Sequence, residues 1–243
     1  MTVATGWEDR LAARGRVRRR TRLAVSLTVV VVLALLVAAG WVLLGSGLLG
    51  VRTVQVGGTV RLDSAQVRAA AGVADGTPLV LVDTAAVASR VARLPVVRSV
   101  DVARDWPGTV VIRVRERTAA AARQIGSSYA LIDRTGVAFA TLTRRPKGLP
   151  VITAPADAGR PTLRAAVDVL DQLPAGLRDQ VRLVQAAGPD EVVLRLSRHR
   201  TVVWGSAERG ARKAAVLAVL LHRKALKAST YDVSAPDAPT TRR

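Results

Sequence analysis

The longest apolar stretch of the chain lies near its N-terminus, where residues 23–51 contain no charged side chain. Most positions of 23–44 are Val, Leu or Ala, and a helix of that length matches a bilayer core of about 30 Å. A cleaved signal peptide is the alternative, since Ala38-Ala39-Gly40 resembles a cleavage site. Its apolar region would be only about 7–15 residues long, whereas here it continues through Leu44. The pattern therefore predicts an uncleaved transmembrane helix over 23–47.

Residues 51–118 show alternating hydrophobic positions interrupted by two helical patterns. Alternation predicts three strands, around Val54–Val56, Val97–Val102 and Val110–Val114. The two helices are predicted between the first and second strands. Asp63 or Ser64 is the expected cap of the first helix, and Asp83 or Thr84 opens the second. The predicted order of elements is therefore β-α-α-β-β.

Residues 119–234 are predicted as a second unit, which is richer in strands. Its predicted hairpins are Gln124–Ile132 with Val137–Ala140, across a turn at Asp133–Gly136, and Glu191–Leu196 with Thr201–Trp204. Helical periodicity indicates an amphipathic helix over Pro161–Leu173 and a long one from about Ala207 to Ala228. A last strand is expected at Tyr231–Ser234, and residues 235–243 are expected to form a loose tail. The two units together indicate an α+β protein.

The distribution of charge along the chain predicts its topology. The chain carries a formal charge of +19, which on its own favours a partner that is a nucleic acid or another anion. Residues 1–22, however, contain seven arginines and two acidic residues directly before the apolar stretch. By the positive-inside rule, this bias places the N-terminus in the cytoplasm and the C-terminus outside. The remaining positive charge belongs to residues 52–243, where it is densest between Arg195 and Lys227.

Composition excludes several kinds of chemistry. The chain has no cysteine, which excludes disulfides, thiolate catalysis and cysteine-ligated metals. Its two histidines, His199 and His222, stand beside basic residues and are expected to be solvated, and no metal-binding or nucleophile motif is present. Aromatic residues make up only 3% of the chain, which argues against stacking of single-stranded nucleic acid. We therefore expect no enzymatic activity, no cofactor and no metal.

Several segments, taken in order, resemble the FtsQ/DivIB family of bacterial cell division proteins. Those of the first unit are Val54-Gln55-Val56-Gly57, Gly76-Thr77-Pro78-Leu79, Leu94-Pro95-Val96-Val97 and Arg104-Asp105-Trp106-Pro107. Those of the second are Leu131-Ile132-Asp133, Val203-Trp204-Gly205, Lys213 and Tyr231-Asp232-Val233. The resemblance implies a single transmembrane helix, then a POTRA domain (51–118), then an FtsQ-type β-domain (119–234) with a long C-terminal helix and a final strand. It also implies a place in the inner membrane at the division septum.

In that family the β-domain binds FtsB (DivIC in other lineages) together with FtsL, and the partner adds a strand beside the final strand. The resemblance therefore implies contact positions on this chain, namely Thr230, Tyr231, Asp232, Val233, Ser234, Ala235 and Pro236, with Lys224 and Lys227 on the adjoining helix end. The alternative is that Tyr231 and Val233 simply pack on the long helix while Pro236 blunts the edge. A POTRA surface around Val100, Val102 and Arg104 is a further expected recruitment site.

The charge alone leaves a second function open. The protein would then be a membrane-anchored basic domain that binds an anionic envelope polymer or nucleic acid. Such binding would weaken steeply with salt. Association with a protein partner that does not respond to salt would argue against it.

Overall fold

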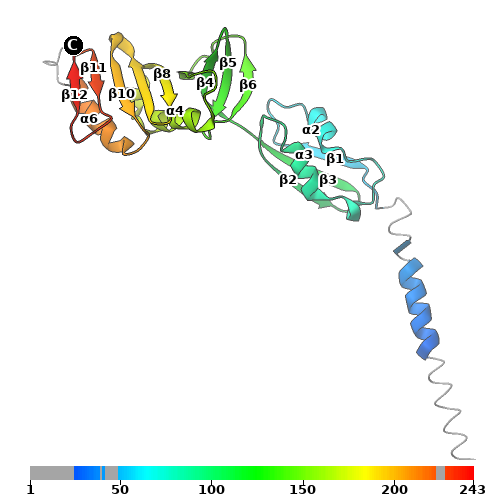
Figure 1. The fold of residues 1–243 in the computed structure, drawn as a ribbon. Helices are drawn as coiled ribbons and strands as arrows, with labels where there is room; N and C mark the ends of the chain where they lie inside the picture. The colour runs from blue at the N-terminus through cyan, green and yellow to red at the C-terminus, as the bar shows by residue number, and fades with distance from the viewer. Residues whose placement is uncertain (1–24, 39, 42–48, 223–227) are drawn as a thin grey trace, which may run out of the picture. The chain divides into compact units, whose positions relative to one another are not determined.

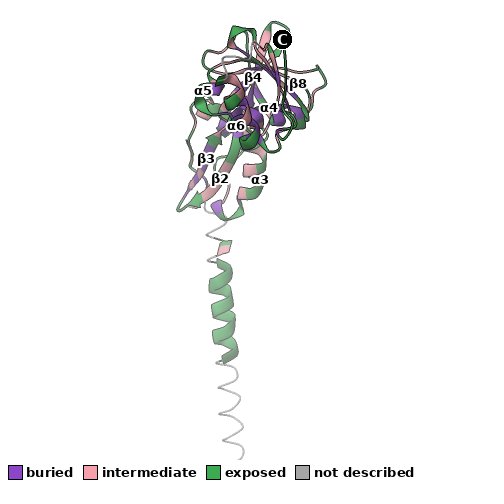
Figure 2. Cartoon of the chain, turned by 90° about the vertical axis from the view of Figure 1, so that its left-hand side faces the viewer, coloured by how far each residue is buried: buried purple, intermediate pink, exposed green. Residues whose placement is uncertain are grey.

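The computed structural model describes residues 25–38, 40–41, 49–222 and 228–243. Residues 25–38 form a helix that is coloured as exposed in Figure 2. Large apolar side chains such as Leu33 and Val37 are more than half exposed there. No helix within these described ranges is both long and apolar enough to cross a membrane. The predicted span over 23–47 lies partly outside them, and the predicted tail over 1–22 lies wholly outside.

The described chain forms two compact units. The first takes in the residues up to Gly57 with Ser64–Val91 and Asp101–Arg113, and the second takes in Gly58–Asp63, Ala92–Val100 and Val114–Arg243. The elements up to residue 116 are β1 (Thr53–Gly57), α2 (Ser64–Ala71), η1 (Leu79–Leu81), α3 (Thr84–Val91), β2 (Val97–Asp105) and β3 (Thr109–Glu116). Their order confirms the predicted β-α-α-β-β pattern (Figure 1).

These strands form a three-stranded sheet in the order β1-β3-β2, with β1 parallel to β3. Alternation along β3 buries Val110 and Ile112, and the helices bury Val67 on α2 and Val87 on α3. Asp83 and Thr84 were the two residues predicted to begin the second helix, and in the structure Asp83 caps it. Its carboxylate accepts hydrogen bonds from the N–H groups of residues 85 and 86, both at 3.0 Å, which satisfies two donors at the start of α3.

A nine-stranded sheet follows, in the order β12-β11-β10-β9-β8-β7-β4-β5-β6. Its strands are β4 (Ala119–Ile125), β5 (Ser128–Asp133), β6 (Ala138–Leu142), β7 (Val151–Thr153), β8 (Val181–Gly188), β9 (Glu191–Leu196), β10 (Thr201–Gly205), β11 (Thr230–Asp232) and β12 (Thr240–Arg242). The other elements are α4 (Arg160–Gln172), α5 (Ala175–Arg178), η2 (Ser197–His199) and α6 (Gly210–His222). Buried side chains of α4 and α6 share one core with those of β8, β9 and β10.

Two predicted elements of this part of the chain are wrong in their limits. The single strand expected over Gln124–Ile132 is a hairpin of β4 and β5, because Gly126 adopts φ +56, which glycine tolerates without steric cost. The long helix begins at Gly210, three residues after its predicted start, and its predicted end at 223–228 lies largely outside the described residues. The helix at 161–173 and the hairpin of β9 and β10 are confirmed.

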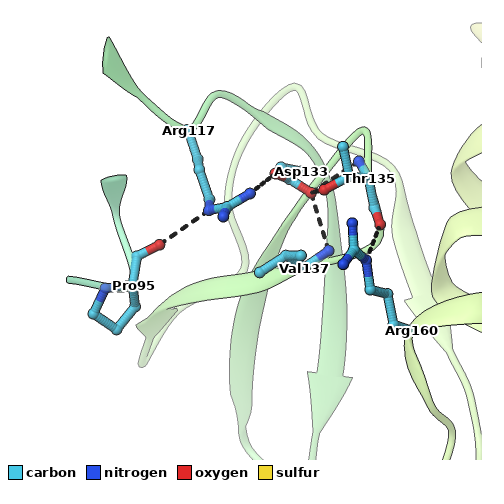
Figure 3. A network of polar contacts seen from close by, with 6 residues as sticks. All are labelled: Pro95, Arg117, Asp133, Thr135, Val137 and Arg160. Carbon is cyan, nitrogen blue, oxygen red and sulfur yellow. Dashed lines mark hydrogen bonds and ion pairs between the residues drawn. The ribbon is translucent and has the colours of Figure 1, made fainter. Parts of the chain in front are cut away.

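A buried carboxylate organises the turn between β5 and β6 (Figure 3). Asp133, with 2% of its surface exposed, accepts hydrogen bonds from the N–H and hydroxyl of Thr135 and from the N–H of Val137. Its other oxygen pairs with Arg117 at 2.5 Å, and Arg117 also donates to the carbonyl of Pro95. Burial by itself would raise the pKa of Asp133, but the hydrogen bonds from Val137, Thr135 and Arg117 hold that pKa below its ordinary value.

Asp133→Asn is expected to lower the free energy of unfolding at pH 7 by about 2 kcal/mol, because Arg117 loses its charged partner. A carboxylate with a lowered folded pKa stabilises the fold above its ordinary pKa of 3.8 and stops doing so as the pH falls through the folded value. The difference between wild type and variant should therefore shrink toward pH 3 in urea unfolding. Asp101→Asn, in an exposed pair with Arg113, is the matched control and should change stability by under about 0.5 kcal/mol.

Candidate functional site at the C-terminal sheet edge

The C-terminal end of the nine-stranded sheet is built by β10, β11 and β12. Strand β11 runs parallel to β10, with Thr230 opposite Thr201, and antiparallel to β12, with Tyr231 opposite Thr241. The N–H of Val233 extends the β10 pairing by donating to the carbonyl of Val203 at 2.9 Å. Strand β11 is therefore an interior strand, and the outermost strand of the sheet is β12, drawn in red in Figure 1.

The predicted contact residues fall into three groups. The buried ones are Tyr231, Val233 and Pro236; Thr230 and Asp232 are half-buried; and Ser234 and Ala235 are exposed. Tyr231 and Val233 belong to the core formed with α6, as the alternative interpretation of these residues expects. Lys224 and Lys227 lie outside the described residues.

The expectation of a loose tail over 235–243 is wrong for Thr240–Arg242, which form β12. Strand β11 leaves backbone groups unpaired on its outer side, and the returning chain satisfies them. A turn in which Ala238 donates to the carbonyl of Ala235 at 3.0 Å brings the chain back. This strand was not predicted from the sequence, although the β-branched pair at 240 and 241 favours extended backbone.

An acidic side chain in the connection to β12 ties it to the start of the long helix. Asp237 accepts a hydrogen bond from Arg209 at 2.8 Å and forms an ion pair with Arg212 on α6. All three side chains are more than half exposed, so each pair contributes little to stability. The contacts nevertheless hold the connection beside the start of α6.

Among the residues that the structure describes, none pairs with the outer side of β12. The carbonyl of Arg242 accepts a hydrogen bond from the N–H of Ser229 at 2.9 Å, so the backbone of Arg242 faces β11. Adjacent residues of an antiparallel strand direct their N–H and C=O groups to opposite sides. Thr241 therefore directs its N–H and C=O to the open edge. All three residues of β12 are exposed.

Two hollows flank this edge. One, of about 100 Å³, is lined by Val203, Thr230, Asp232, Thr240 and Arg242. The other, of about 420 Å³, is lined by the α6 residues Ala215, Val216, Val219 and Leu220 together with Pro239, and the side chain of Val219 is 56% exposed. The first hollow is polar at its rim and the second is apolar. An extended segment places successive side chains on opposite faces, so a strand added at β12 has a hollow available on each side.

A buried lysine on α6 supports this edge of the sheet. Lys213 on α6 is 1% exposed, and its ammonium donates hydrogen bonds to the carbonyls of Trp204 (3.0 Å) and Ser206 (2.9 Å). Burial lowers the pKa of Lys213, and the nearby charge of Arg209 lowers it further. The contacts fasten the end of β10 to the first turns of α6, and β11 pairs with that same strand.

The second expected surface lies on β2, which is an edge strand of the three-stranded sheet. Val100 and Val102 are half-buried there. Arg104 is exposed, but its guanidinium donates to the carbonyl of Val82 from Nε (3.2 Å) and Nη2 (2.8 Å). Arg104 therefore braces the chain around residue 82, which leaves the valines and the backbone of β2 as the features available to a partner.

The described residues show no arrangement that points to catalysis. Across the described ranges, no three His, Cys, Asp or Glu side chains come together as metal ligands. His222 is exposed, with its Nδ1 atom 2.7 Å from the carbonyl of Ala218, and His199 lies in the short turn η2. The two histidines stand on different elements, and neither is paired with a nucleophile.

Two family models match the chain. Residues 49–117 match a POTRA domain of FtsQ type, and residues 121–234 match the C-terminal domain of the cell division proteins FtsQ and DivIB. The cell division protein FtsQ of Streptomyces bingchenggensis is 41% identical over 237 residues, covering 92% of this chain and 89% of that protein. FtsQ of Streptomyces coelicolor is 38% identical, covering 93% and 91%. FtsQ of Mycolicibacterium smegmatis is 39% identical, covering 86% of this chain and 62% of that longer protein. The chain thus belongs to the FtsQ/DivIB family of bacterial cell division proteins.

Proposed function

We propose that this protein is a divisome scaffold whose β-domain receives a strand from FtsB/DivIC, together with FtsL, at the outer edge of β12. The observation that carries the proposal is the exposed strand β12 with the Thr241 N–H and C=O directed outward. A partner strand can satisfy these backbone groups, and the hollows on either face can select its side chains. The proposed contact positions are therefore Thr240–Arg242 in place of Thr230–Pro236, of which several are buried.

The proposal includes an anchor in the inner membrane. The charge-free stretch 23–51 follows an arginine-rich tail, which favours a single span over 23–47 with the N-terminus in the cytoplasm. The exposed apolar side chains of the helix at 25–38 support this placement, because exposed apolar surface is costly in water. We further propose that 51–118 and 119–234 act as separate POTRA and β-domains, and that β2 serves recruitment at the septum.

Site-specific crosslinking tests the docking edge directly. A photoreactive residue at position 241 is expected to crosslink in dividing cells to FtsB/DivIC or FtsL. The matched control is position 142 at the end of β6, on the opposite edge of the same sheet. Crosslinks of equal strength from both positions, or partner crosslinks from 142 alone, would contradict docking at β12.

A further inference from the structure

A basic groove lies on the second unit, far in sequence from the docking edge. Its volume is about 500 Å³, and its walls come from the loop between β6 and β7 and from the segment joining α5 to β8. Five charged side chains line it, and four of them are cationic: Arg145, Lys147, Arg178 and Arg182, against Asp179 alone. Along the sequence the positive charge is densest between Arg195 and Lys227, so this concentration of cations arises only from the fold.

The cations of the basic groove are incompletely neutralised. In the part of the chain that the structure describes, no hydrogen bond or ion pair engages the charged groups of Lys147 and Arg182. Arg145 donates to the carbonyl of residue 182 at 3.3 Å, which holds the two walls together without supplying a negative charge. Arg178 is 3.8 Å from the Asp171 carboxylate, and its own Nε is buried without a hydrogen-bond partner. Like charges gathered in this way repel, and a bound anion relieves the repulsion.

The lining also restricts the class of anion. Guanidinium groups bind phosphate through paired hydrogen bonds, and an ammonium group adds a compact point charge. The remaining lining residues are Pro146, Gly148, Leu149, Pro150 and Val181. None of them is aromatic, so the groove lacks the aromatic side chains on which nucleobases usually stack. Its volume lies within the range of small-molecule and cofactor sites.

We propose that the basic groove binds an anion that carries several phosphate groups and no nucleobase, such as a phosphodiester polymer or a cluster of lipid phosphates. This site is independent of partner docking at β12, because no residue of β10, β11, β12 or α6 lines it. The phosphates would be held by Lys147 and Arg182, with Arg145 and Arg178 closing the two walls around them.

Binding of inorganic tripolyphosphate to the full chain in a non-ionic detergent tests the site by calorimetry. The double variant Lys147→Glu/Arg182→Glu is expected to bind at least tenfold more weakly, a change of about 1.4 kcal/mol. The matched control is Arg98→Glu/Arg115→Glu, which changes the net charge equally at exposed positions of β2 and β3. It should stay within twofold of wild type. Equal weakening by both variants would show diffuse charge attraction and overturn the proposal, as would no binding by wild type.

Two further arms complete the experiment. Calorimetry in the same detergent with short-chain phosphatidylglycerol, against short-chain phosphatidylcholine, distinguishes lipid phosphates from a soluble polymer, and loss of phosphatidylglycerol binding in the groove variant alone assigns the lipid source. Tripolyphosphate should raise the thermal midpoint of wild type but not of the groove variant. If the glutamates unfold the chain, Lys147→Ala/Arg182→Ala provides the same comparison with smaller perturbation, and wild-type affinity in that variant would overturn the proposal.

Discussion

Thr241→Pro is expected to weaken binding of the proposed partner, FtsB/DivIC with FtsL, about 10- to 100-fold. Proline lacks the N–H that Thr241 directs to the open edge, so a carbonyl of the added strand is left without a donor. An unsatisfied buried carbonyl costs about 1–3 kcal/mol, which corresponds to this loss of affinity. The measurement is co-purification of the partners with the full chain, followed by calorimetry on the purified components.

The same substitution should leave the fold intact. The N–H that proline removes faces away from β11, and proline is tolerated on edge strands when its nitrogen faces solvent. The thermal midpoint should therefore match that of Thr241→Ala, which keeps the N–H and serves as the control. Retention of full affinity by Thr241→Pro, with Thr241→Ala also unaffected, would exclude strand addition at β12. Loss of affinity in both variants would instead assign the contact to the threonine side chain.

The sequence predicted the parts of the fold that depend on local pattern. Alternating valines gave β3, and a capping aspartate at 83 gave the start of α3, because both depend on neighbours a few residues away. Gly126 was missed as a turn because the apolar alternation continues on both sides of it. The order of the nine strands, with β7 inserted between β4 and β8, depends on contacts between distant segments that no local pattern carries.

The sequence predicted contact positions in β11 and did not predict strand β12 beyond it. Tyr231 was expected as an interface anchor, but an aromatic residue in a strand has the same pattern whether a core or a partner covers it. Strand β12 has three exposed residues, so it lacks the apolar alternation by which strands are recognised. It forms because β11 leaves an edge to pair with, which is a property of the assembled sheet.

The basic groove shows the same limitation for charge. Lys147 and Arg182 are separated in sequence by strand β7 and helices α4 and α5, and the fold brings them to one hollow. The net charge of +19 indicated an anionic partner in general terms, but a sum over the chain does not indicate where cations converge.

Lys213→Ala is expected to lower the free energy of unfolding by about 3–5 kcal/mol and the thermal midpoint by roughly 8–15 °C. The substitution removes the packed alkyl chain and leaves the carbonyls of Trp204 and Ser206 without their donor. Lys213→Met retains most of the packed volume while removing the donor, so it should lose about half as much. Urea unfolding of the full chain, read at pH 7, measures both variants.

The pH dependence of the stability difference between wild type and Lys213→Met tests whether the buried amine has a lowered pKa in the folded chain. Because the folded pKa of Lys213 lies below its ordinary value of 10.5, the unfolded chain binds this proton more tightly than the folded chain. As the pH rises toward 10.5, the unfolded chain also loses this proton, and its advantage in proton binding disappears. The free energy of unfolding of the wild type therefore rises with pH relative to a variant without the amine. The stability deficit of Lys213→Met relative to wild type should therefore be larger at pH 10 than at pH 7. A deficit that is constant with pH, or one that shrinks as the pH rises, would contradict the lowered pKa of Lys213.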